Sequence, residues 1–145
     1  MELLERATQS GQAPNPDHLL AAIPFCRHLG LRAEQSEGRL VLVMPFAPHL
    51  VGNPVLPALH GGVIGSLLET MAIAQIILEL GGTKLPKPID ISVDYLRSGR
   101  AVETRARAHI AKLGRRVVNV HAELWQDDPE KPIASLRGHF LLGTV

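Results

Sequence analysis

The sequence predicts a single α+β domain in which an antiparallel, curved sheet wraps around one long central helix. The first observation is a long apolar run from Gly61 to Leu80, closed by Gly81-Gly82, which indicates a buried helix with a glycine stop. Two strand-like segments precede this run and four follow it. The connections between the segments are short, whereas parallel neighbours would need long crossovers. An antiparallel meander around one apolar helix is the simplest packing of this order.

The N-terminal region is expected to add little to this core. Residues 1–16 read as a flexible or helical extension, because Gly11, Pro14, Asn15 and Pro16 interrupt any regular pattern. Asp17 is expected to cap a short helix that runs through Ile23 and is ended by Pro24. The whole chain, residues 1–145, is therefore expected to be one domain.

The two segments before the long helix are expected to be a pair of strands. Residues 28–35 and 39–45 flank Glu37-Gly38, a dipeptide typical of a tight turn. Residues 46–59 are rich in proline, and they predict an irregular, fairly rigid loop that leads into the helix.

The four segments after the helix are strand-like, and the first two show the alternation of a half-buried strand. They cover residues 89–97, 102–110, 117–125 and 133–142. Short turns are expected between them at 98–100, 112–115 and 127–132.

The composition excludes several classes of protein. The chain has 145 residues, 46% of them hydrophobic, which is enough for a packed core without disulfide or metal support. A formal net charge of +1, with one Trp, one Tyr and three Phe, gives no indication of a basic or aromatic surface that would bind nucleic acid. The lone Cys26 has no partner in the chain and suits a reducing compartment, so we expect a cytoplasmic protein. The acidic start of the chain is unlike a signal peptide, and Glu69 and Glu79 within the apolar run argue against a membrane span.

Glu69 is the exceptional residue of the long helix. It is the one charged residue between Gly61 and Leu78. Burial of a carboxylate without a partner costs several kcal/mol, so such a group is protonated, paired or functional. The alternative is an ordinary carboxylate on an exposed stripe of the helix.

A second candidate feature, His60-Gly61-Gly62, opens the same helix. Two glycines leave backbone N–H groups uncovered at a helix N-terminus, where a carbonyl oxygen would be polarised; the alternative is a flexible junction. Gly62 and Glu69 lie on nearly the same helix face but about 10 Å apart along the axis. One reacting carbon cannot touch both within a chain. The two groups therefore serve different purposes, or they meet across two chains of an obligate dimer.

These residues resemble a known signature. His60-Gly61-Gly62, followed by Glu69-Thr70, is similar to the "HGG…(D/E)T" motif of hot-dog-fold acyl-CoA thioesterases of the PaaI-like and 4-hydroxybenzoyl-CoA thioesterase groups. The preceding segment, Leu50–Pro54, resembles the lead-in of many bacterial members. The order of elements matches over about residues 19–143. Many PaaI-like members carry Asp at the position of Glu69, whereas relatives of the 4-hydroxybenzoyl type use Glu.

The resemblance implies roles for four residues. The Gly61 N–H would polarise the thioester carbonyl, and Glu69 of the partner subunit would attack it or activate water. Asn53, or a water that it holds, would help orient the nucleophile, although some relatives place Asn or Gln where this chain has Pro54. His60 is expected to shape the turn rather than act as a base.

The resemblance also implies how the substrate is held. Gly62 belongs to the motif, and Ser92 matches a position where some relatives place a hydroxyl near the reacting centre; a plain strand serine is the alternative. Coenzyme A phosphates would meet basic residues near strand ends, of which the candidates are Arg97, Lys112, Arg115 and Arg116. The expected partners are an acyl-CoA substrate and a second copy of the chain, in a dimer or a dimer of dimers. No cofactor is expected beyond the coenzyme A of the substrate.

Two other functions stay open. The segment His49–Pro57 resembles the "HFPGNPV(L/M)PG" segment of hot-dog β-hydroxyacyl dehydratases, which pair that His with a helix Glu about fourteen residues later. In this chain position 63 is Val63, and Glu69 lies twenty residues after His49. A non-catalytic acyl-CoA binding protein is the third possibility. The histidines and Cys26 show no zinc-ligand spacing, so no metal is expected.

Overall fold

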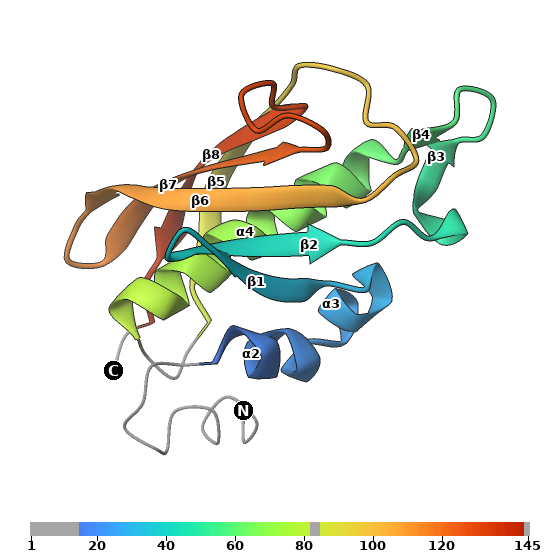
Figure 1. The fold of residues 1–145 in the computed structure, drawn as a ribbon. Coiled ribbons are helices and arrows are strands. Elements are labelled where there is room, and N and C mark those ends of the chain that lie inside the picture. Colours follow the sequence, from blue (N-terminus) through green and yellow to red (C-terminus); the bar gives the residue numbers. More distant parts are fainter. Residues whose placement is uncertain (1–14, 82–84, 144–145) are drawn as a thin grey trace.

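The fold is a six-stranded antiparallel sheet that curves around one long helix, as Figure 1 shows for the computed structural model, which describes residues 15–81 and 85–143. The helix, α4, runs from Gly61 to Leu80, and Gly81 caps it with a positive φ of 69°. Both bounds agree with the sequence, so the predicted α+β architecture of a curved sheet around a central helix is confirmed.

The composition of α4 would by itself allow a membrane span. The structure instead buries one side of the helix against the sheet, and each fully buried large apolar side chain contributes about 1.5–3 kcal/mol to stability. The buried residues of α4 are Ile64, Leu67, Leu68, Met71, Ala72, Ala74, Ile76 and Ile77. The helix is therefore the core of the domain.

From residue 15 on, two short helices precede the sheet, where one was expected. The first, α2 (Pro16–Ala22), is capped by Asn15, whose side chain accepts the Asp17 N–H, so the prediction of Asp17 as the cap is wrong. The second, α3 (Pro24–Leu29), begins at the proline that ends the first, because proline is preorganised for the first position of a helix. Residues 1–14 of the expected N-terminal extension lie outside the described residues.

The first strand is shorter than predicted. β1 (Arg32–Ser36) follows α3, because Gly30 ends that helix in the left-handed conformation; residues 28 and 29 therefore do not belong to a strand. β1 pairs with β2 (Arg39–Met44) through a turn in which Glu37 and Gly38 have φ values of 52° and 75°. The predicted turn is confirmed.

The loop before α4 is more regular than expected. It contains a short 3-10 helix, η1 (Pro48–Leu50), and a small hairpin of β3 (Val51–Asn53) and β4 (Ala58–Leu59). The hairpin tip protrudes at the upper right of Figure 1, and Val55 at that tip is 89% exposed.

The remaining strands are β5 (Lys87–Tyr95), β6 (Thr104–Leu113), β7 (Val117–Trp125) and β8 (Ala134–Leu141). The sheet order is β1-β2-β6-β7-β8-β5, so β5 pairs with β8 and the predicted meander is wrong for this strand. Residues 96–103 are a crossover rather than a turn. The Gly99 carbonyl within them accepts the Leu59 N–H at 2.9 Å, which fixes the crossover to the segment that enters α4. β5 is consequently an edge strand.

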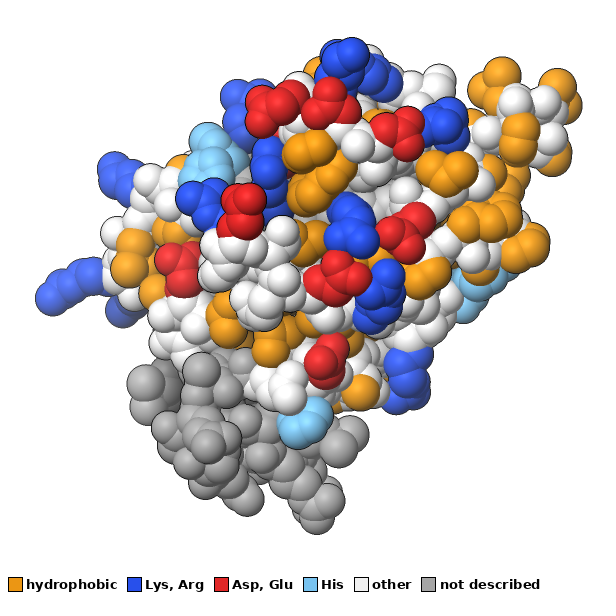
Figure 2. Space-filling view, in the orientation of Figure 1, with side chains coloured by type: hydrophobic (Ala, Val, Ile, Leu, Met, Phe, Trp, Pro, Cys, Tyr) orange, Lys and Arg blue, Asp and Glu red, His pale blue; other side chains and the backbone are white. Residues whose placement is uncertain are grey.

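The two faces of the sheet differ in character. The face toward α4 carries the main apolar core, to which Leu42, Ala106, Val120 and Leu136 contribute. The opposite face carries acidic and basic side chains in alternation, as Figure 2 shows. Function is therefore sought at α4 and at the elements that meet it.

Candidate active site

The N-terminus of α4 is held by hydrogen bonds on both sides. His60 is its N-cap, and the His60 Nδ1 accepts the Gly62 N–H at 2.9 Å. The His60 N–H donates to the Leu50 carbonyl, also at 2.9 Å. A side chain at Gly52 would come within 2.5 Å of the His60 Cα, so glycine there permits the hairpin to pack against the cap. His60 thus caps the start of the helix.

These bonds leave one N–H of the first turn available. The Gly62 N–H is taken by His60 Nδ1, and the N–H groups of Val63 and Ile64 donate to the His60 carbonyl. The Gly61 N–H has no acceptor among residues 15–81 and 85–143. A free N–H at the positive end of a helix can stabilise developing negative charge on a carbonyl oxygen. Local geometry therefore favours Gly61 over Gly62 as the donor.

Packing within the chain does not require glycine at position 61. An added Cβ would lie 3.6 Å from Tyr95 Cε1, an ordinary contact, whereas one at Gly62 would lie 3.0 Å from His60 Nδ1. The Tyr95 hydroxyl donates to the Gly61 carbonyl at 2.8 Å and so fixes the helix end against β5. The missing side chain at Gly61 keeps the approach to its N–H open.

Glu69 lies two turns further along α4 and borders a pocket of about 200 Å³. Its neighbours on that helix face, Ser66 and Thr70, turn their hydroxyls back to the helix: Ser66 donates to the Gly62 carbonyl and Thr70 to the Ser66 carbonyl, each at 2.7 Å. In the described part of the chain, no hydrogen bond or ion pair reaches the Glu69 carboxylate. This carboxylate is therefore free to act on a bound molecule.

One chain does not bring Gly61 and Glu69 to the same atom. They are eight residues apart on one straight helix, which corresponds to about 12 Å along the axis. Acyl transfer needs a donor for the oxyanion and a base or nucleophile, and Gly61 and Glu69 offer groups of these two kinds. Within one chain, however, they are too far apart to act on the same carbonyl.

Asn53 takes part in the turn of the hairpin tip. Its Oδ1 accepts the N–H of Val55 at 2.9 Å and of Leu56 at 3.3 Å. These two hydrogen bonds occupy the side-chain oxygen of Asn53. A role of its Nδ2 group in orienting a nucleophile stays a prediction.

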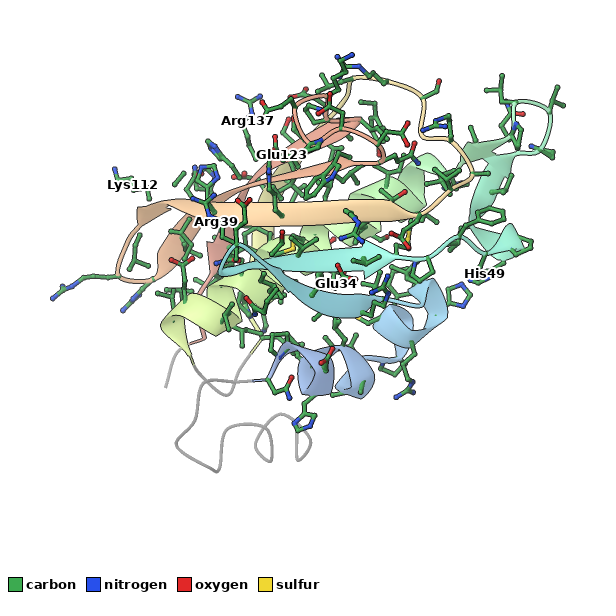
Figure 3. The ribbon with its side chains drawn as sticks, viewed as in Figure 1. Glu34, Arg39, His49, Lys112, Glu123 and Arg137 are labelled. Carbon is green, nitrogen blue, oxygen red and sulfur yellow. The ribbon has the colours of Figure 1, made fainter. Side chains whose placement is uncertain are left out.

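The basic candidates lie at opposite ends of the sheet. Arg97 follows β5 at the Gly61 end of α4 and donates to the Pro132 carbonyl at 2.6 Å. Arg115, with Lys112 and Arg116, belongs to the β6–β7 turn region, separated from that end by the ten residues of β6, or roughly 30 Å. Figure 3 shows Lys112 and His49 at the two ends of the molecule. Arg97 and Arg115 of one chain therefore cannot bind the same phosphate group.

Ser92 lies on β5 opposite Arg137 of β8. Its neighbours Ile91 and Val93 pack against the core, and alternation along a strand therefore turns Ser92 to the face away from α4. Within one chain the structure does not bring Ser92 to Gly61 or Glu69, and its proposed role in substrate binding stays a prediction.

His49, the key residue of the dehydratase alternative, is engaged elsewhere. Its Nε2–H donates to the His28 carbonyl at 2.8 Å, and its ring lies against the His28 ring with centroids 4.7 Å apart. These contacts direct the imidazole to α3 rather than to the pocket beside Glu69, of which His49 is not a lining residue. Within residues 15–81 and 85–143, no three His, Cys, Asp or Glu side chains are placed to hold a metal ion.

Sequence reasoning missed two parts of this site. Tyr95 was assigned only to a strand, although its inward alternation with Ile91 and Val93 was a signal that it would meet the helix. The pocket beside Glu69 depends on α2 and α3, whose packing no local pattern reveals.

Comparison with known proteins decides the family. The sequence model of the thioesterase superfamily matches residues 56–133, a stretch that contains all of α4 and its glycine motif. The chain belongs to the thioesterase superfamily. The expectation of a thioester hydrolase with the hot-dog fold is thereby confirmed.

Individual relatives agree with this assignment. The thioesterase is 32% identical over 138 residues to the medium/long-chain acyl-CoA thioesterase YigI of Salmonella typhimurium, covering 83% of this chain and 86% of the relative. A crystal structure of a Chromobacterium violaceum protein is 34% identical, with a TM-score of 0.72 and coverage of 99% and 96%. A phenylacetic acid degradation-related protein of Ralstonia eutropha shares the fold, with a TM-score of 0.73, 23% identity and coverage of 88% and 98%.

Proposed function

We propose that this protein hydrolyses acyl-CoA thioesters in a homodimer, with Gly61 of one subunit and Glu69 of the other at each site. The observation that carries the proposal is the pair of complementary groups on α4, a free N–H at Gly61 and an unpaired carboxylate at Glu69, about 12 Å apart. A dimer in which two copies of α4 run antiparallel would bring each N-terminus to the middle of the other helix.

The two edges of the sheet support this assembly. The β1 edge is five residues long, carries Arg32 and Glu34, and is flanked by α2. The β5 edge is nine residues long, and it carries or adjoins exposed Ile89, Tyr95 and Leu96. Long edges left open favour pairing with another chain, and pairing of β5 with its own copy about a two-fold axis is antiparallel. A dimer of dimers stays a further prediction.

The chemistry follows from the two groups. The Gly61 N–H, with the helix dipole behind it, stabilises the oxyanion that forms when the thioester carbonyl is attacked. The Glu69 carboxylate takes a proton from the attacking water, or attacks the carbonyl itself and is released by water in a second step. In both cases the C–S bond breaks, and free acid and the coenzyme A thiol leave. Arg97 is the candidate nearest the Gly61 end for a phosphate of coenzyme A.

The acyl-CoA substrate is also supported by the curated relatives, which are named medium/long-chain acyl-CoA thioesterases. The buried, unpaired Cys26 fits a cytoplasmic protein.

The test is release of free thiol from a series of acyl-CoA thioesters of two to sixteen carbons, together with aryl-CoA thioesters. We expect saturable turnover by the wild-type dimer. Hydration of enoyl-CoA without thiol release would instead support the dehydratase. Saturable binding of acyl-CoA without any turnover would support the binding protein, and either result would overturn the proposal.

A further inference from the structure

The pocket beside Glu69 is formed by three helices and the segment that leads into β5. α2 and α3 form its outer wall and α4 its inner wall. Its lining consists of Leu19, Leu20, Ile23, Phe25, Ser66, Glu69, Thr70, Ile73 and Leu85. The pocket thus belongs to the subunit that supplies the carboxylate.

The walls of this pocket are mostly apolar. Six of the nine lining residues are hydrophobic, namely Leu19, Leu20, Ile23, Phe25, Ile73 and Leu85. The hydroxyls of Ser66 and Thr70 are satisfied by carbonyls of α4, so neither offers a free donor to a ligand. A pocket of this kind suits hydrocarbon, with one carboxylate at its wall.

The two ends of the pocket differ. Phe25 is 51% exposed and belongs to α3, which reaches the Gly61 end of the molecule through the contact of His28 with His49. Ile73 lies one turn beyond Glu69 toward the C-terminus of α4, and Leu85 lies just before β5. With the thioester carbonyl at Glu69, an acyl tail that points away from exposed Phe25 would end at Ile73 and Leu85.

The volume limits what the pocket can hold. An apolar cavity of about 150 Å³ accommodates benzene, with six carbons. By proportion, the pocket of about 200 Å³ would hold roughly eight carbons. This fits the tail of a medium-chain acyl group.

We propose that this pocket binds the hydrocarbon tail of the acyl group, and that Ile73 ends it and sets a preference for medium chains near eight carbons. The proposal rests on the thioesterase function proposed above and adds a substrate class and a specificity-determining residue. Each methylene that fits the pocket is expected to raise kcat/KM about fourfold, until the chain meets Ile73.

Two opposite substitutions at one position test the proposal. In Ile73→Phe the larger ring fills the distal end, so the preferred acyl chain is expected to shorten by about two carbons. In Ile73→Ala the distal end opens, so the preferred chain is expected to lengthen. Because the two shifts have opposite signs, a general loss of stability cannot imitate them. Profiles of kcat/KM are measured with acyl-CoA thioesters of four to sixteen carbons.

Leu78 provides the matched control. It is partly buried on the same helix but lines a separate cleft with Leu40 and Ala108. Leu78→Phe and Leu78→Ala are expected to leave the preferred chain length unchanged. An unmoved profile in both Ile73 variants would overturn the pocket assignment, as would a wild-type optimum at sixteen carbons. Absence of thiol release by the wild type with every substrate would overturn the proposed function instead, so the two failures can be distinguished.

Discussion

Two glutamates, Glu34 on β1 and Glu69 on α4, hold their carboxylates in opposite electrostatic surroundings. Glu34 lies on the face of the sheet away from α4 (Figure 3) and accepts hydrogen bonds from Arg105, at 2.7 Å, and from Arg32. Arg105 first, and then Arg32, lower the pKa of Glu34 below its ordinary value. Glu69 borders an apolar pocket, and no cation contacts it in the described part of the chain.

The difference separates a structural carboxylate from the one proposed to act in catalysis. The oxygens of Glu34 accept hydrogen bonds from two guanidinium groups, and the one from Arg105 joins β1 to β6. The oxygens of Glu69 have no such partners in the described part of the chain, and this residue lines a largely apolar pocket. Substitution at these two positions should therefore affect different properties of the protein.

The largest effect is expected from Glu69→Gln. Loss of the base or nucleophile should lower kcat by about 10²–10⁴-fold, while the thermal midpoint and the oligomeric state stay those of the wild type. Glu79→Gln is the control, because Glu79 lies on the same helix but is exposed and bonded to Gln75; it should keep full activity. Thiol release and thermal unfolding are measured side by side. Retained turnover in Glu69→Gln would refute the mechanism.

The second largest effect is expected from deletion of one N–H. Gly61→Pro removes it, proline is accepted at the first helical position, and His60 already has the extended conformation (φ −63°, ψ 132°) that precedes proline. Loss of an oxyanion donor should lower kcat by about 10²–10³-fold. Gly61→Ala, for which the chain has room, adds a side chain but keeps the N–H. If the two variants lose equal activity, crowding rather than the N–H is responsible.

A smaller effect is expected from Tyr95→Phe. The variant loses the hydroxyl that holds the Gly61 carbonyl at 2.8 Å, so the N–H on the same residue is oriented less well. We expect kcat to fall by less than about tenfold with KM nearly unchanged. A change in thermal midpoint without a change in kcat would assign Tyr95 a purely structural role.

The smallest effect on activity is expected from Glu34→Gln, which should act on stability alone. The lowered pKa of Glu34 means that its ion pairs stabilise the fold above the pKa of the unfolded chain and are lost as the pH falls through the lower folded value. The wild type should therefore unfold at a higher temperature than Glu34→Gln at pH 7. The difference should shrink as the pH falls below about 4. Thermal midpoints between pH 2 and 8 test this, and a constant difference would contradict it.

The parts of the fold that could be predicted depend on local patterns. α4 was bounded at both ends by its glycines, because these signals lie at the ends of the segment itself. The edge position of β5 was missed because a crossover over the end of the sheet looks like a turn in sequence. Residues 28 and 29 were placed in a strand because the helix signal of Pro24 was taken only as a stop.

The candidate site shows the same limit. Glu69 and Gly61 could be found because a lone charge in an apolar helix and a glycine pair at its start are visible in sequence. The resemblance already implied Gly61 rather than Gly62 as the donor, and the structure adds a physical argument for that choice, because His60 takes the Gly62 N–H. Arg97 and Arg115 were named as equal candidates from the sequence, although the strand that the sequence predicts between them already separates them by the length of the sheet.

The most direct test of the central claim mixes two inactive variants. Glu69→Gln and Gly61→Pro are unfolded together in equal amounts and refolded, so that about half of the dimers contain one copy of each. Each mixed dimer has one site with both Gly61 and Glu69 intact, so thiol release should recover to about one quarter of the wild-type rate. A mixture that stays as inactive as its two parents would contradict a site shared between subunits.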